Sequence, residues 1–200
     1  MSRIILAALA VLAASTTLAQ AAPDPAATAK TQPSLGGPLI KGVCLLSEDV
    51  VMRDAQVGVN AYKRVQQLKD QAQAEVNSAR APVDADFKAL QADAPKGPPA
   101  DIEKRRVAIQ ARYQILQDMT EQRSREIEAT RVKAVERISL ELQSVVAAVY
   151  KAKGCGLLLN RNAVLGGNLG GDLTVDVIKG LDAKITSFAF DRENLPSPAR

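Results

Sequence analysis

The chain contains no histidine and no tryptophan, and aromatic residues make up only 3% of its 200 residues. The absence of histidine removes the usual general base, the partner of serine and cysteine nucleophiles, and the commonest metal ligand. So few aromatic side chains also make a large compact core unexpected. The sequence therefore predicts neither an enzyme nor a site for a metal or a cofactor.

Long apolar runs are scarce as well. One lies near the N-terminus, where Arg3 precedes an apolar stretch at residues 4–14 and the small-x-small pattern Ala19–Ala21 follows. This arrangement is typical of a signal peptide, and the run is shorter than the roughly 20 residues that a membrane-spanning helix needs. We expect residues 1–21 to be removed and the mature chain to begin at Ala22, outside the cytoplasm.

A strong excess of either charge is also missing. The chain has 26 lysine and arginine residues against 22 aspartate and glutamate residues, and the two signs are interspersed. A modest positive balance of this kind favours contact with acidic surfaces such as anionic lipid headgroups. A nucleic-acid partner is not predicted, because the sequence lacks a dense basic patch.

What the sequence does contain is a long region of helical periodicity that follows a short apolar run. Residues 22–38 are rich in alanine, proline, threonine and glycine, and are predicted to be a disordered tether. Residues 39–48 form the apolar run and are predicted to hold a strand. Ser47 and Asp49 are both suitable N-caps for a helix that begins there. Residues 49–153 are predicted to be helical.

The helical region divides into two long helices. From Asp49 onward apolar residues recur at steps of three or four, which predicts one amphipathic helix. A cluster of prolines and a glycine at residues 94–100 predicts a tip, after which Asp101 is the candidate N-cap of a second helix. Pro82 removes a backbone donor and is expected to kink the first helix, so it is a candidate hinge. The pattern predicts a long antiparallel hairpin.

Residues 154–190 are predicted to return to the base of the hairpin, with a strand at Cys155–Leu159, a turn at residues 160–162, a second strand at Ala163–Leu165 and a short amphipathic C-terminal helix. The glycine-rich stretch Gly166–Gly171 before this helix resembles a phosphate-binding loop. It lacks the GK[ST] ending and the GxGxxG spacing of such loops, and is interpreted as a flexible connector. The polar residues 191–200 are predicted to be a disordered tail.

The predicted fold class is α+β and mainly α: a long antiparallel helical hairpin inserted in a small β-body, with a short C-terminal helix. A body of this kind offers too few short strands for a stable sheet with a covered face. Oligomerisation would let neighbouring bodies pool strands and apolar surface. We therefore expect the chains to associate through the body.

The only two cysteines, Cys44 and Cys155, lie in the two predicted body strands. In an oxidising compartment, cysteines that meet across neighbouring strands can form a disulfide, which would tie the base of the hairpin. Free cysteine is, however, among the most buried residue types, so two separately buried thiols are the alternative. The sequence alone leaves both open.

Three stretches carry a resemblance to a known family. Residues 42–47 supply a first strand, residues 153–165 read KGxxLLLNxNAVL, and residues 172–181 read DLTxDVIKxL. Together with the long charged hairpin, they resemble the Skp/OmpH family of periplasmic chaperones. The likeness covers nearly all of the mature chain in layout, whereas the residue patterns match in the two C-terminal stretches.

The resemblance implies a periplasmic homotrimer whose helical arms enclose unfolded outer-membrane proteins and prevent their aggregation without ATP. Its partners would be those clients and the sister chains, and the basic charge balance of the chain adds an anionic lipid or lipopolysaccharide surface. The candidate client-facing residues of the arm are Val83, Phe87, Leu90 and Met119. A structural coiled-coil or spacer protein of the cell envelope, without chaperone activity, is the alternative.

Overall fold

The computed structural model describes residues 35–196, so the predicted signal peptide and residues 22–34 of the tether lie outside the described residues. The elements, in chain order, are β1 (Val43–Leu46), α1 (Glu48–Asp54), α2 (Gln56–Asp93), α3 (Pro99–Ala152), β2 (Leu157–Asn160), the 3-10 turns η1 (Arg161–Ala163) and η2 (Leu169–Gly171), and α4 (Thr174–Lys184). The predicted fold class, α+β and mainly α, is confirmed.

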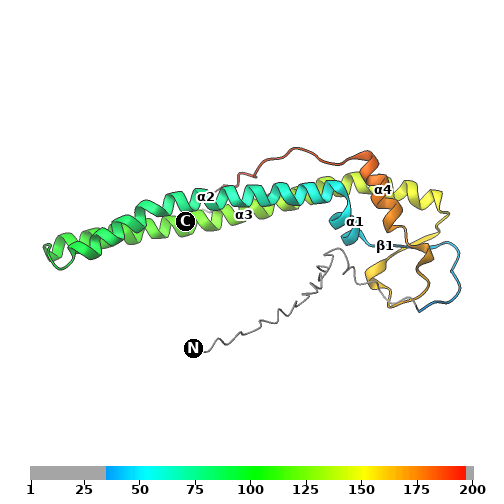
Figure 1. Ribbon diagram of the computed structural model, residues 1–200, viewed down its shortest axis with the longest axis horizontal. Helices are drawn as coiled ribbons and strands as arrows, with labels where there is room; N and C mark the ends of the chain where they lie inside the picture. The colour runs from blue at the N-terminus through cyan, green and yellow to red at the C-terminus, as the bar shows by residue number, and fades with distance from the viewer. Residues whose placement is uncertain (1–34, 197–200) are drawn as a thin grey trace, which may run out of the picture. The chain divides into compact units, whose positions relative to one another are not determined.

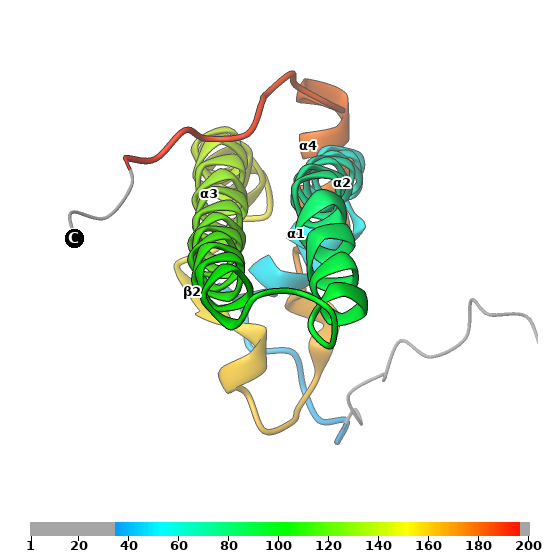
Figure 2. The same ribbon diagram turned by 90° about the vertical axis from the view of Figure 1, so that its left-hand side faces the viewer.

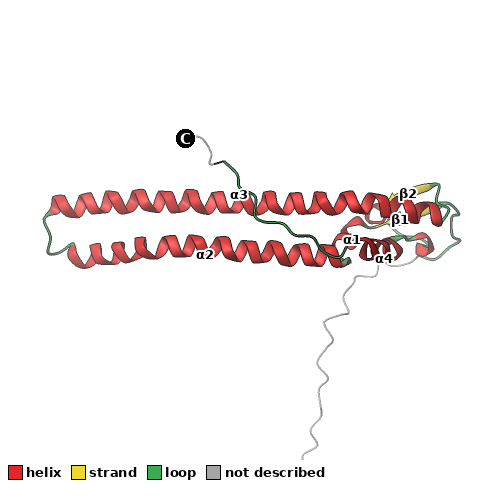
Figure 3. Ribbon diagram, turned by 90° about the horizontal axis from the view of Figure 1, so that it is seen from above, coloured by secondary structure: helices red, strands yellow, loops and turns green. Residues whose placement is uncertain are grey.

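Helices α2 and α3 run antiparallel and lie side by side (Figures 1 and 3). They contain 38 and 54 residues, which at 1.5 Å per residue correspond to rods of about 57 and 81 Å. Each helix buries one narrow stripe and leaves the rest exposed, as two packed rods must. The stripe of α2 comprises Val57, Gly58, Ala61, Leu68, Ala72, Val76, Val83 and Leu90, and that of α3 comprises Ile109, Leu116, Glu126, Thr130, Ala134, Ile138, Leu142 and Val145.

The prediction of one unbroken helix from Asp49 is wrong, because the chain leaves the helical conformation at Ala55, where ψ is 142°. Ala55 is fully buried, and the backbone N–H of Gln56 donates to Asp182 Oδ1 at 2.7 Å. An aspartate of α4 therefore caps the start of α2. The sequence period could not reveal this break, since the capping residue is 126 positions away.

Strands β1 and β2 pair in parallel, with Val43 opposite Leu157. A parallel pair needs a long crossover connection, and here the crossover is the whole hairpin. On the other side of β1, the backbone N–H of Leu173 donates to the carbonyl of Leu45 at 2.8 Å. Strand β1 is therefore covered on both sides, and β2 forms an edge of the sheet. The prediction of a second strand at Ala163–Leu165 is wrong, because the chain enters the 3-10 turn η1 directly after β2.

The main core lies where the hairpin meets the strands and α4. Val177 and Leu181 of α4 are fully buried in it, and the Thr174 hydroxyl accepts a hydrogen bond from the backbone N–H of Ser47 at 3.0 Å. This group of residues is termed the base cluster. It comprises Cys44, Leu46, Val51, Ala55, Val57, Ala61, Ile138, Leu142, Val145, Leu173, Val177 and Leu181.

The helix starts differ in how well the sequence predicts them. Ser47 caps α1, because its hydroxyl accepts from the backbone N–H of Val50 at 3.4 Å. Asp101 does not cap α3, which begins at Pro99 with Pro98 in the N-cap position. Proline is favoured at the first helical position, where no backbone donor is needed. Asp101 lies in the first turn, where its negative charge interacts favourably with the helix dipole.

Helix α2 continues through Pro82, so the helix does not end there, and bending at this residue stays a prediction.

The prediction of a disordered tail is wrong for residues 191–196. These residues lie against the hairpin, and Arg192 pairs with Glu75 at 2.9 Å. Within residues 35–196, none of the helices has the length and apolar content that crossing a membrane requires.

Gly58 provides a test of the close contact between α1 and α2. A Cβ atom at this residue would lie 1.9 Å from the carbonyl oxygen of Met52, so Gly58→Ala forces the two helices apart. We expect a loss of about 1–3 kcal/mol of unfolding free energy, the usual effect of overpacking. Thermal and urea unfolding followed by circular dichroism would measure it. The matched control is Gly156→Ala, whose Cβ would come no nearer than 3.7 Å to Gly42; equal losses in both variants would contradict the argument.

Candidate functional site

The outer half of the hairpin has its own apolar contact between the helices, termed the outer seam. Val83 and Leu90 of α2 pack with Ile109 and Leu116 of α3, and each of the four is at most 6% exposed. The prediction that Val83 and Leu90 face a client is therefore wrong. A side chain that closes the contact between two helices has no surface left for another protein.

Polar contacts cross between the helices along the same stretch. Arg105 donates to Asp93 at 2.8 Å, and the Tyr113 hydroxyl donates to Asp84 at 2.8 Å. This hydrogen bond raises the pKa of Tyr113 above its ordinary value of 10, with smaller contributions from burial and from the charge of Asp84. These contacts and the outer seam fix the register of α2 against α3.

Other apolar side chains of this half face outward. Val107 and Ile115 are 56% and 59% exposed, and Met119 is half-buried. Ile115 and Met119 are four residues apart and so are neighbours on the helix surface, and Val107 lies about two turns nearer the tip. The three residues are termed the α3 stripe. On α2, Phe87 is 41% exposed, with its ring edge-on to that of Tyr113 at a centroid distance of 6.3 Å.

Two of the four predicted client-facing residues, Phe87 and Met119, thus keep accessible surface. Sequence reasoning missed Val107 and Ile115. The sequence did contain a signal, because both residues are apolar but fall outside the predicted seam. Ile115, for example, directly precedes Leu116, which is buried. Adjacent helical residues point about 100° apart, so they cannot both face the partner helix. Exposed apolar residues nearer the base are Tyr62, Val132, Val135 and Leu140.

The tip of the hairpin surrounds a hollow of about 670 Å³. Its lining carries Asp93 and Asp101 together with Lys96, Lys104 and Arg105, and Arg105 is paired with Asp93. A lining that mixes both signs in this way produces no strong field of one sign. Binding of anionic lipid therefore gains no support from the tip, and it stays a prediction.

The body exposes apolar side chains on strand β2. Leu157 and Leu159 are 51% and 38% exposed, whereas Cys44, Leu45 and Leu46 of β1 are buried. In the described part of the chain the sheet has two strands, so the outer edge of β2 is unpaired. An apolar strand with an open edge is a surface on which another chain can pair.

The structure joins Cys44 to Cys155 by a disulfide, with the two Cα atoms 5.8 Å apart. Cys44 lies in β1, and Cys155 lies between α3 and β2. The bond therefore crosses the base of the hairpin, next to the parallel strands. It is a structural link, because both sulfurs are consumed in it and no free cysteine is present among the described residues.

Comparisons with known proteins agree on one family. The family model for the outer membrane protein (OmpH-like) group matches residues 42–181. A solved structure from Caulobacter crescentus, described as an OmpH-like outer membrane chaperone, is 34% identical, covers 80% of this chain and 94% of that chain, and has a TM-score of 0.74. No curated protein matches the chain.

The fold is a strand-poor body that carries a long helical hairpin with exposed apolar side chains, and its family is that of the OmpH-like chaperones. The chain belongs to the OmpH-like family, as the sequence resemblance predicted. Members of this family are in general periplasmic and not enzymes. In residues 35–196 no cluster of cysteine or acidic side chains is arranged to hold a metal ion.

The disulfide can be tested by labelling. An alkylating reagent should modify neither Cys44 nor Cys155 in the folded oxidised protein, and both after reduction. Reduction should lower the thermal midpoint, because the bond closes a loop with a sequence separation of 111. On the entropic model such a loop contributes about 4–5 kcal/mol. The double variant Cys44→Ser/Cys155→Ser should match the reduced protein and not respond to reductant. Complete labelling before reduction would show free thiols.

Proposed function

We propose that this chain is an ATP-independent periplasmic holdase that encloses unfolded outer-membrane proteins between the helical arms of a homotrimer. The observation that carries the proposal is the exposure of the α3 stripe on a hairpin whose own seam is already filled. Family membership supports the client class, because the related Caulobacter structure is described as an outer membrane chaperone.

The α3 stripe suits weak and repeated contact with unfolded chains. An apolar side chain that is half-exposed gains about 1 kcal/mol when a client covers the rest of it. One such contact binds too weakly to hold a client, but several arms that act together raise the avidity by orders of magnitude. Contacts of this kind need no defined client sequence and release the client without nucleotide hydrolysis.

The features of the body support the proposed trimer. A two-stranded sheet is marginal in water, and here β2 also leaves Leu157 and Leu159 exposed. Association of three bodies through these strands would cover the apolar side chains. The three hairpins would then project from a common base, an arrangement that is needed to enclose a client.

The holdase activity can be tested by diluting an unfolded outer-membrane β-barrel protein out of urea and following its light scattering. The chain should suppress aggregation near one trimer per client. The double variant Val107→Ser/Ile115→Ser should need roughly a thirtyfold higher concentration, since it removes about 1 kcal/mol of contact per side chain and so about 2 kcal/mol per arm.

Leu140→Ser is the matched control, because Leu140 is also on α3 and is 62% exposed but lies nearer the base. If the control and the double variant weaken the suppression of aggregation equally, the α3 stripe has no special role in holding clients. A parent protein that leaves aggregation unchanged would refute the holdase proposal and favour an envelope spacer.

The proposed assembly has a separate test. Multi-angle light scattering of the parent chain should give the mass of a trimer at micromolar concentration. Leu157→Lys/Leu159→Lys should shift it toward monomer, because lysine on an edge strand opposes pairing. Val132→Lys, on the exposed face of α3, should leave the trimer intact. A parent chain that is monomeric at that concentration would contradict the assembly.

A further inference from the structure

Between the base cluster and the outer seam, α3 buries polar side chains where apolar ones are expected, whereas α2 still buries the apolar Leu68, Ala72 and Val76. Glu126 and Thr130 of α3 are each only 2% exposed. A buried carboxylate is unfavourable unless charged or hydrogen-bonding groups surround it. At this polar break, α2 and α3 therefore need partners other than each other's apolar side chains.

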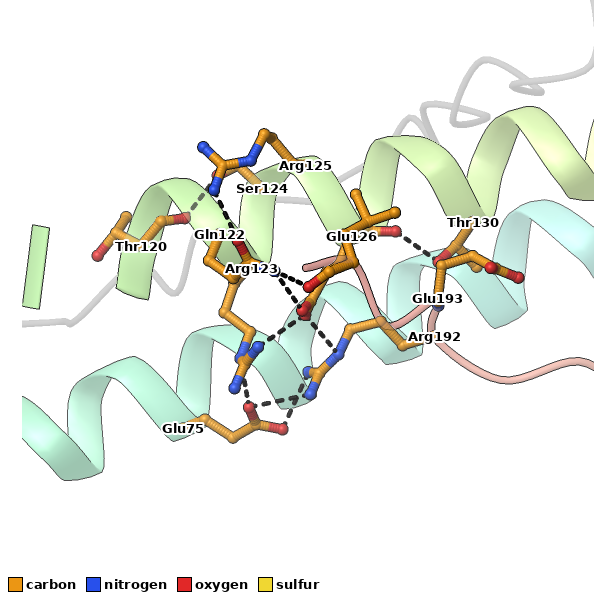
Figure 4. Close-up of polar contacts among 11 residues, drawn as sticks. Glu75, Thr120, Gln122, Arg123, Ser124, Arg125, Glu126, Thr130, Arg192 and Glu193 are labelled. Carbon is orange, nitrogen blue, oxygen red and sulfur yellow. Dashed lines mark hydrogen bonds and ion pairs between the residues drawn. The ribbon is translucent and has the colours of Figure 1, made fainter. Parts of the chain in front are cut away.

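The C-terminal segment supplies such a partner. Nε of Arg192 lies 3.3 Å from Glu126, and Nη1 donates to Glu75 at 2.9 Å. Arg123 completes the group, since it donates to both Glu126 and Glu75 at 2.7 Å. Figure 4 shows Arg192 between Glu75 of α2 and Glu126 of α3. Two arginines and two glutamates thus connect both helices with the C-terminal segment.

Backbone groups of the same segment are also bound. The N–H of Glu193 donates to the Thr130 hydroxyl at 2.9 Å, and the carbonyl of Leu195 accepts from Gln122 at 2.6 Å. Figure 2 shows the segment leaving α4 on the side of α2 and crossing to α3. Because these contacts use the main chain, they hold an extended segment across the two helices.

The segment is anchored where it begins. Phe188 and Phe190 stack with ring centroids 5.1 Å apart and pack against the base cluster. The carbonyl of Phe190 accepts from Arg64 of α2 at 3.1 Å. Two of the chain's three phenylalanines thus lie at this point. The segment has an apolar anchor at one end and the polar break at the other.

We propose that residues 188–196 are an intramolecular strap that fastens α2 to α3 at the polar break and confines bending of the hairpin to its outer half. The inner half then behaves as a rigid continuation of the base cluster. The outer half, which carries the α3 stripe, moves relative to it. The family match ends at residue 181, so the strap lies outside it. Any effect of the strap on client binding rests on the proposed function.

Solvent can reach one of the strap's ion pairs, the pair between Arg192 and Glu75. The side chains of Arg192 and Glu75 are 22% and 40% exposed. The hydrogen bond from Arg192 is the main cause that lowers the pKa of Glu75, so Glu75 stays ionised at neutral pH. Partly exposed ion pairs are weakened by salt. The strap is thus able to detach without unfolding of the base.

Hydrogen–deuterium exchange of the mature protein tests the strap. One variant ends after Phe190, which keeps both anchoring phenylalanines, and a second carries Arg192→Gln. Amides of α2 near residues 68–79 and of α3 near residues 122–134 should exchange at least about tenfold faster, because hydrogen bonds to charged groups are lost. Amides of the base cluster and the outer seam should keep their rates.

The matched control is Arg131→Gln, which removes an exposed ion pair with Glu128 on the same part of α3. It should leave the exchange rates unchanged. The strap proposal would be overturned by any of three results. Exchange rates could be unchanged in both strap variants, they could rise equally throughout the chain, or they could rise as much in the Arg131→Gln control. These readouts do not depend on clients, so a failed aggregation assay would refute the holdase and leave the strap untouched.

Discussion

The parallel pairing of β1 with β2 is the contact on which the rest of the structure depends, because it joins two segments that the entire hairpin separates. The disulfide between Cys44 and Cys155 links the same place covalently. Helix α4 packs over it, and Asp182 caps the start of α2. Without this base, α2 and α3 would be two long helices in contact along a narrow stripe, which is a weak basis for a fixed arm.

Along the arm, stability is unevenly distributed. The base cluster and the outer seam are apolar, while the part between them buries Glu126 and Thr130. Apolar burial is tolerant of small shifts, whereas a buried carboxylate requires particular partners at particular distances. The segment that carries Arg192 meets this requirement from outside the hairpin. The polar break is therefore the point at which the stiffness of the arm is set.

The surfaces of α3 serve different purposes along its length. One face closes the seam with α2, and near the middle it also receives the C-terminal segment. Toward the tip, Val107 and Ile115 are left exposed although they are apolar. This exposed apolar surface is available for contact with another chain. It agrees with a chaperone of the OmpH-like family, whose task is contact with other chains.

The sequence by itself determined the hairpin, its tip, the family and the fold class, because periodicity, prolines and short motifs are local signals. It did not determine the break at Ala55, which depends on Asp182, or the order of residues 191–196, which depends on Glu75 and Glu126. It also could not separate seam residues such as Val83 from exposed ones such as Ile115. Those distinctions arise only when distant segments pack together, since helical spacing specifies a face and not what covers it.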